Sequence, residues 1–255
     1  MANSRSGDSV IDRLVRVLST FDRDHRVLTP AEIARHAELP TSTAHRLVGD
    51  LAGAGLLERD EGGGYRIGLR LWELATRGSQ ALGLREAAIP SMERVQARLR
   101  QHTQLAVLDG DETLFLERLS HPGAGANIAQ VAGRLPLHAS SSGLVLLAAA
   151  PASLVDRVLA RPLPALASGT ITDPAALRRK LAEVRRLGYA IAPASVEDVS
   201  TGVAVPVVVG RATVAALGVV LPHEEVDARA VAGVLSAAAR EIAQTLVTQQ
   251  SRSMG

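Results

Sequence analysis

Cysteine is absent from the 255-residue sequence, which excludes disulfides, zinc–thiolate sites and thiol nucleophiles together. Aromatic residues make up only 2% of the chain, so its cores must be built from alanine, valine, leucine and isoleucine. No apolar run approaches the length of a transmembrane helix, and the polar stretch Met1–Ser9 does not resemble a signal sequence. We therefore expect a soluble protein of a reducing compartment, the cytoplasm.

A strong charge of either sign is also missing. The chain carries 28 basic and 26 acidic residues, with a formal net charge of +2, and Lys180 is its only lysine. Acidic residues balance the arginines in the N-terminal third as well. Any affinity for nucleic acid must therefore come from where the arginines lie and not from total charge. The 47% hydrophobic content is that of a globular protein.

Turn residues and apolar spacing divide the N-terminal part into short helices followed by a hairpin. Thr29-Pro30 supplies an N-cap and a first-turn proline, and Pro40 ends that helix. In the next helix we expect Leu47, Leu51 and Ala54 to face inward. The expected helices and strands cover residues 10–21, 29–37, 41–54, 56–59 and 65–67.

From residue 103 onward the periodicity changes to a mixture of strands and helices. The segment that starts at Asp173-Pro174 is typical of a capped helix, and Gly188 ends it. The predicted helices are 84–102, bent or divided by Pro90, and then 141–150, 153–160, 173–188 and 227–247. The predicted strands are 104–108, 113–119, 127–131, 189–192, 203–209 and 213–221.

This change of pattern predicts an α+β protein with two domains. Residues 8–68 form the first domain, and residues 84–250 form the second. A helix from Leu69 to about Leu82, within the linker 69–83, joins them.

A helix, a short turn with proline, a second helix and a glycine-rich hairpin together are the order of a winged helix-turn-helix. The start of the second helix of such a pair enters the major groove, where hydroxyls and helix amides suit phosphate and arginine suits guanine. The alternative is that Thr41 only caps the helix and that its polar side is merely solvated. We predict a double-stranded DNA operator as the partner, contacted by Thr41, Ser42, Thr43, His45, Arg46, Arg59 and Arg66.

The segment LTPAEIARHAELPTSTAHRLVGDLAGAGLLERDEGGGYRIGLRLWELA resembles the DNA-binding region of IclR-type regulators. Their pattern is close to L-P-x-S-T-x-x-R-L-L-x-x-L-x-x-x-G-L, before a wing that ends in Y-x-[LI]-G. Val48 stands where the pattern has its second leucine. The segments LPLHASSSGLVLLAA, RRLGYAI, GVAVPV and VAALGVVLP resemble the effector domain of the same family, so the likeness spans about residues 10–250.

The resemblance implies a GAF-like effector domain with a curved antiparallel sheet, homodimers that often pair into tetramers, and a ligand-responsive regulator that is more often a repressor. It also implies an effector pocket that involves Leu135, Ser141, Ser142, Ala192, Gly202, Gly218 and Val220.

The pocket departs from relatives that bind small oxoacids. Those relatives carry a carboxylate near Ala192, a cysteine near Gly202 and serines near Gly218 and Val220, and this sequence has none of these. The small and apolar residues at these positions leave space and form an apolar wall, but they do not supply the hydrogen-bond donors that a buried carboxylate needs. We therefore expect a larger, less polar effector, aromatic or acyl-bearing, whose polar end binds at the serines. Helix capping by the serines and close strand packing at Gly218 are the alternatives.

The sequence offers weaker signs of a hydrolase and of a metal-binding protein. His138, the serines at 140–142 and Asp198 or Glu197 form a hydrolase triad on paper, but no G-x-S-x-G elbow is present. The histidines lack metal-ligand spacing, and no cofactor is expected. A dimeric effector sensor that no longer binds DNA remains the main alternative.

Overall fold

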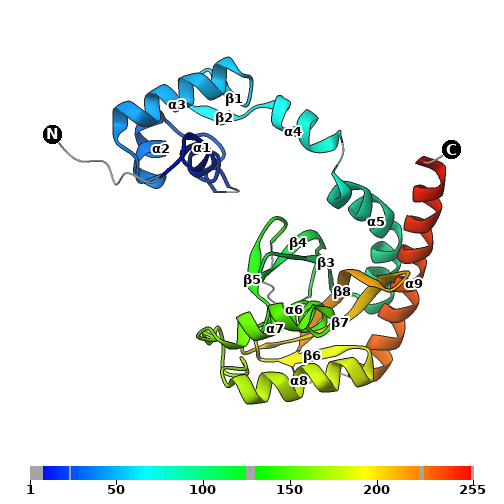
Figure 1. The fold of residues 1–255 in the computed structure, drawn as a ribbon. Helices are drawn as coiled ribbons and strands as arrows, with labels where there is room; N and C mark the ends of the chain where they lie inside the picture. Colours follow the sequence, from blue (N-terminus) through cyan, green and yellow to red (C-terminus); the bar gives the residue numbers. More distant parts are fainter. Residues whose placement is uncertain (1–7, 23, 78, 125–129, 224–226, 254–255) are drawn as a thin grey trace. The chain divides into compact units, whose positions relative to one another are not determined.

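The structure is a computed structural model that describes residues 8–22, 24–77, 79–124, 130–223 and 227–253. The chain divides into two compact units, Met1–Ser79 and Gln80–Gly255 (Figure 1). The finer division into a head at 8–68, a linker at 69–83 and an effector domain at 84–250 remains a prediction.

The N-terminal unit packs its helices and a hairpin around one small core. Its elements are α1 (Val10–Leu18), α2 (Pro30–His36), α3 (Thr41–Gly53), β1 (Leu57–Arg59), β2 (Tyr65–Ile67) and α4 (Leu69–Thr76). The core joins Val17 of α1, Ile33 of α2 and Leu47 of α3, and Leu57 of β1 closes it. This arrangement confirms the expected winged helix-turn-helix.

Local signals explain where these elements begin and end. Ser9 and Thr29 each form a capping box, with Asp12 and Glu32 respectively. The β1–β2 hairpin is the wing. After it, the chain passes so close to the end of α3 that a Cβ on Gly68 would lie 2.3 Å from the carbonyl oxygen of Gly55. Glycine is therefore required at position 68 by space and not by backbone angle.

Two expectations for this unit are wrong. Ala54 is exposed, because α3 ends at Gly53 and Ala54 lies in the cap; Ala44 and Val48 are buried on the inner side instead. The expected helix from Leu69 to Leu82 is interrupted, since α4 ends at Thr76 and the next helix begins at Gln80. The sequence Arg77-Gly78-Ser79 between them contains two residues of low helix propensity.

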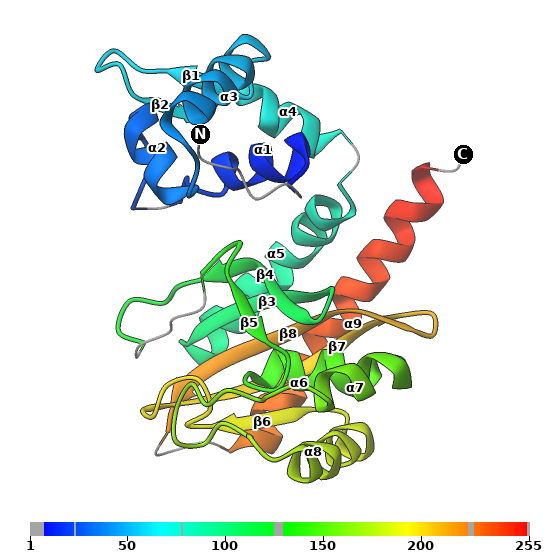
Figure 2. The ribbon, with the colours of Figure 1, turned by 60° about the vertical axis from the view of Figure 1, so that its left-hand side comes forward.

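The C-terminal unit is built on one antiparallel sheet that curls into a half-barrel (Figure 2). Its strand order is β5-β4-β3-β8-β7-β6. The strands are β3 (His102–Asp109), β4 (Glu112–Leu119), β5 (Arg134–Pro136), β6 (Ala190–Pro193), β7 (Ser200–Val209) and β8 (Ala212–Pro222). Bulges interrupt the register at Leu105/Ala106 and at Val207/Val208, and they help the sheet to curve.

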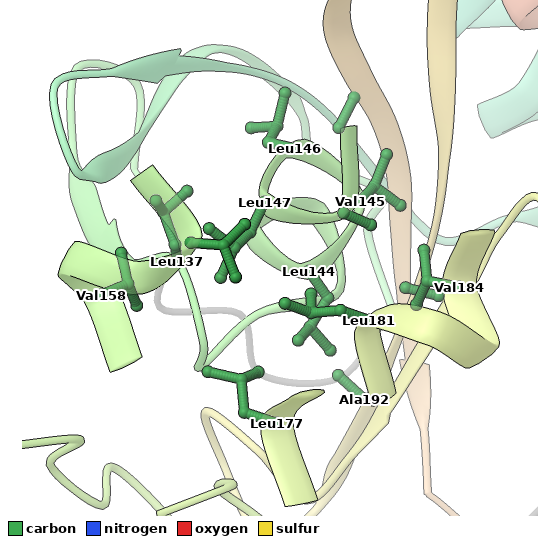
Figure 3. Packing of buried hydrophobic residues seen from close by; sticks show 14 of the residues in the cluster. Leu137, Leu144, Val145, Leu146, Leu147, Val158, Leu177, Leu181, Val184 and Ala192 are labelled. Carbon is green, nitrogen blue, oxygen red and sulfur yellow. The ribbon is translucent and has the colours of Figure 1, made fainter. Parts of the chain in front are cut away.

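Helices cover both faces of this sheet. They are α5 (Gln80–Leu99), α6 (Ser141–Ala149), α7 (Ala152–Leu159), α8 (Pro174–Leu187) and α9 (Ala228–Ser253). Met92 of α5 and Leu235 of α9 pack on one face. On the other face α6 is buried all round, and Leu144 and Leu147 meet Leu177 and Leu181 of α8 (Figure 3). The expected GAF-like α+β architecture is confirmed.

Three details of this unit differ from expectation or refine it. Of the strand expected at 127–131, residues 127–129 lie outside the described residues, and a short edge strand occurs at Arg134–Pro136 instead. Pro90 does not divide α5, since Ala88 and Met92 on either side of it are packed against the sheet. Among the described helices, α9 alone has the length and composition to cross a membrane, but its apolar side is packed in the core.

The packing of α8 predicts that a leucine-to-alanine substitution lowers the stability of the fold by different amounts at two positions of this helix. Leu181 is 0% exposed, whereas Leu187 near the helix end is 36% exposed. Leu181→Ala should lower the free energy of unfolding by about 2–5 kcal/mol because it removes buried surface and leaves a cavity. Leu187→Ala should cost less than about 1 kcal/mol. Urea denaturation followed by circular dichroism measures both, and equal costs would contradict the packing.

Candidate DNA interface and effector cavity

The third helix divides cleanly into a buried side and an exposed side. Ala44, Leu47 and Leu51 are buried against the rest of the N-terminal unit. The residues expected to contact DNA lie on the opposite side: Thr41, Ser42, His45 and Arg46 are exposed, and Thr43 is half-buried. The structure therefore places five of the expected DNA-contacting residues together on the first turns of one helix.

The N-terminus of this helix has no side-chain cap. Pro40 occupies the N-cap position, and Thr41 is the first helical residue, so Thr41 does not act as the cap. Helices α1 and α2 of the same unit are both capped by hydroxyl side chains. An uncapped, exposed helix start presents free N–H groups and a positive dipole end, which are suited to phosphate oxygens.

The arginine of this helix is paired with an acid one turn further on. Nη1 of Arg46 donates to Oδ2 of Asp50 at 2.9 Å, and both side chains are 58% exposed. Sequence reasoning did not single out Asp50, although its i,i+4 spacing from Arg46 was visible.

The wing arginines differ from each other. Arg59 is exposed at the end of β1, whereas Arg66 lies opposite Glu58 in the hairpin register. Nη2 of Arg66 donates to Oε2 of Glu58 at 3.2 Å, and Oε1 of Glu58 accepts the backbone N–H of Leu69 at 3.0 Å. The Leu69 N–H and then Arg66 hold the pKa of Glu58 below its ordinary value of 4.5, against a small opposing effect of desolvation. One carboxylate thus ties the wing to the start of α4.

A small cavity lies in the C-terminal unit between α6 and the sheet. Its volume is about 30 Å³. Its walls include six of the seven residues expected for the effector pocket: Leu135, Ser141, Ser142, Ala192, Gly202 and Val220. The seventh, Gly218, lies behind the wall, where a Cβ would come within 3.1 Å of Oγ of Ser142.

The three serines at the start of α6 have different roles. Ser140 is the N-cap, and its Oγ accepts the backbone N–H of Gly143 at 3.0 Å. Ser141 and Ser142 are therefore not needed for capping, and both line the cavity. Gly202 faces them so closely that a Cβ there would lie 2.6 Å from Oγ of Ser141. Capping and cavity lining, posed as alternatives for the serines, both occur: Ser140 caps the helix, and all three serines line the cavity.

Several wall residues were missed by sequence reasoning. They are Gln104, Phe115, Ser140, Val196, Glu197 and Ser200. Gln104 follows His102 and Thr103 at the polar start of β3, and all three are buried, which the sequence pattern does not reveal. Val196 and Glu197 lie in the irregular segment between β6 and β7, where no alternation of polar and apolar residues indicates which side chains point inward.

The hydrolase triad does not form. Nε2 of His138 lies 3.0 Å from the carbonyl oxygen of Pro164, and Asp198 instead accepts the backbone N–H of Ser168 at 2.8 Å. No group of three or more potential metal ligands occurs among the residues that the structure describes.

These features define a two-domain transcription regulator, with a helix-turn-helix head and an effector-binding domain. The profile described as "Bacterial transcriptional regulator IclR C-terminal" matches residues 78–247. The profile described as "IclR helix-turn-helix domain" matches residues 10–61. The chain belongs to the IclR family of transcriptional regulators.

Individual relatives support the same assignment. The chain is 52% identical to an IclR homolog from Microbacterium hydrocarbonoxydans, solved as a complex with 4-hydroxybenzoate; the match covers 94% of this chain and 100% of that one, with a TM-score of 0.90. It is 27% identical over 181 residues to the transcriptional regulator KipR of Bacillus subtilis, covering 71% and 72% of the two chains. It is also 27% identical over 191 residues to the transcriptional repressor AllR of Klebsiella pneumoniae, covering 74% and 70%. The chain is therefore a regulator and not an enzyme.

The hydrogen bonds that Glu58 accepts from Arg66 and from the backbone of Leu69 predict a pH-dependent contribution to the stability of the fold. A lowered pKa means that the ionised carboxylate stabilises the fold above pH 4.5, and that this stabilisation is lost as pH falls through the lower folded-state value. Glu58→Gln should therefore lower the melting temperature at pH 7, and the difference from wild type should shrink as pH falls below 4.5. Glu61→Gln removes a carboxylate at the wing tip and serves as the matched control at pH 7. A difference in melting temperature between Glu58→Gln and wild type that stays constant with pH would exclude this stabilisation by the Glu58 carboxylate.

Proposed function

We propose that this regulator binds a palindromic DNA operator through α3 and the wing, and that a small molecule in the C-terminal cavity modulates that binding. The observation that carries the proposal is the uncapped, exposed start of α3, which bears hydroxyls and Arg46 on a packed support. Bound over a promoter, the protein acts as a repressor; the AllR relative is likewise known as a transcriptional repressor. Its place of action is the bacterial cytoplasm, where the DNA lies.

A homodimer suits this function. Helix α4 buries none of its residues, and three of its apolar side chains, Leu69, Trp72 and Leu74, are more than half exposed, with Trp72 at 67%. Apolar surface of this kind is typical of an interface. Two heads in a dimer would read two half-sites, as in other helix-turn-helix proteins.

The cavity supports an aromatic carboxylate as the effector. Phe115, Leu135 and Val220 supply apolar wall, and the free hydroxyls of Ser141 and Ser142 lie at the N-terminus of α6. A helix N-terminus favours a negative group, so the carboxylate belongs there and the ring belongs against the apolar wall. The Microbacterium relative, complexed with 4-hydroxybenzoate, contains a ligand of this class.

Binding of such a ligand requires the cavity to open. Its volume is about 30 Å³. A cavity that holds a benzene ring is about 150 Å³. Val196 and Glu197 belong to the segment between β6 and β7, which is the irregular part of the wall. Movement of this segment would admit the ligand. The difference between the affinities of the ligand for the two conformations then limits how far it can shift the protein from one to the other.

The DNA function predicts a large effect of one arginine. A duplex selected from a random-sequence pool by the full-length protein provides the operator probe. Arg46→Ala should weaken binding to it by about 1–3 kcal/mol, because a base-edge contact is lost. Arg13→Ala, on α1, removes the same charge away from α3 and should cost far less.

Fluorescence anisotropy measures both affinities, and sedimentation of the complex should show two chains on each duplex. Equal affinities for wild type and Arg46→Ala would remove Arg46 from the interface. A wild-type protein that selects no duplex would leave the effector sensor without DNA binding as the better description.

The effector function predicts that the cavity is sensitive to a single methyl group. Gly202→Ala would place a Cβ 2.6 Å from Oγ of Ser141, so 4-hydroxybenzoate should bind at least tenfold more weakly in calorimetry. Gly233→Ala on α9 meets nothing within 4 Å and should leave the affinity unchanged. Tight binding of glyoxylate or pyruvate, with no response to aromatic acids, would overturn the proposed ligand class.

A further inference from the structure

The outward side of α3 carries an acid where a DNA-binding surface is expected to be basic. Ser42, Arg46 and Asp50 are spaced four residues apart and therefore lie along one face of the helix. All three are exposed. A carboxylate on this face repels phosphate, so Asp50 reduces the attraction of the helix for DNA of any sequence.

The Arg46–Asp50 pair contributes little to the stability of the fold. Both partners are 58% exposed, and exposed pairs at i,i+4 contribute only about 0.3–0.5 kcal/mol. The corresponding pair in the wing has a further structural task, because Glu58 also accepts the N–H of Leu69. Among the described residues, Asp50 has no partner other than Arg46. The repulsion of phosphate by Asp50 is the same for every sequence, so any effect of Asp50 on the choice between sequences must act through Arg46.

The geometry of the pair leaves the arginine able to read a base. Only Nη1 of Arg46 donates to Asp50, and no acceptor for Nε or Nη2 occurs among the residues that the structure describes. A guanidinium presents five N–H donors in a rigid fork, so the remaining edge is free for two parallel hydrogen bonds. The O6 and N7 atoms of guanine accept such a pair in the major groove.

We propose that Asp50 is a specificity-determining positioning residue that holds the guanidinium of Arg46 for a guanine edge and withholds it from phosphate. This inference rests on the proposed DNA-binding function. A side chain that is already held loses less entropy when it binds the correct base. Without its acid, Arg46 neutralises backbone phosphate wherever it can reach one, and that contact carries no sequence information.

The test compares two duplexes and several full-length variants. One duplex is selected from a random-sequence pool by the wild-type protein, and the other has the same bases in scrambled order. The ratio of the two affinities measures specificity, and the slope of log K against log salt measures phosphate contacts.

Asp50→Asn should bind the scrambled duplex more tightly, with a slope steeper by about 0.9, which is one phosphate contact. Its specificity ratio should fall by about tenfold, within the range that a bidentate base contact supplies. Asp50→Glu keeps a carboxylate within reach of Arg46 and should retain most of the ratio. In an Arg46→Ala background, Asp50→Asn should leave the ratio unchanged, because its effect acts through Arg46.

The matched control is Asp8→Asn. Asp8 pairs with Arg16 at 2.7 Å and is 52% exposed, so this variant makes the same chemical change and breaks an exposed Arg–Asp pair away from α3. Both Asp→Asn variants should melt within a few degrees of wild type, which separates specificity from folding.

A specificity ratio of Asp50→Asn equal to that of wild type, or an equal fall in Asp8→Asn, would overturn the role of Asp50 while leaving the DNA-binding function intact. Failure of the wild-type protein to select any duplex would refute the proposed function and this inference together.

Discussion

The burial of one side of α3 is the constraint on which the regulator depends. Leu47 and Leu51 pack with Ile33 of α2 and Val17 of α1, so the helix cannot rotate about its axis without exposing them. Burying side chains of this size stabilises the unit by about 1.5–3 kcal/mol each. Because the inner side is fixed in this way, the hydroxyls of the first turn and Arg46 are held on the outer side.

The two units treat the start of a helix in opposite ways. At α6 the side chain of Ser140 satisfies the helix terminus, and the two following serines remain available to a ligand in a buried cavity. At α3 a proline stands at the N-cap, and the helix amides are left to the solvent. The free N–H groups of a buried helix start need a partner within the protein. Those of an exposed start can bind water until a ligand replaces it. The same local element is therefore proposed to bind a small carboxylate in one unit and the phosphate backbone of DNA in the other.

Most of the fold was predictable because its signals are local. Thr29-Pro30, Asp173-Pro174 and Gly188 place helix ends by their own chemistry, and the wing glycines mark the hairpin. Strand β5 was not predicted, because so short an edge strand depends on pairing with β4 and not on its own periodicity. Family resemblance located half of the cavity wall, but not Gln104 or Glu197, since a strand pattern does not show which polar side chains share a cavity.

The most direct test of the account uses the absence of cysteine from the sequence. An iron chelate attached at Ser42→Cys generates hydroxyl radicals beside the first turn of α3, and the same chelate at Ser153→Cys on α7 provides the comparison. If α3 enters the major groove, the chelate at position 42 should cleave a selected duplex at two discrete clusters, about one helical turn or a multiple of it apart. The chelate at position 153 should produce no such clusters. Tight binding with diffuse cleavage from position 42 would contradict the claim that this helix reads the DNA.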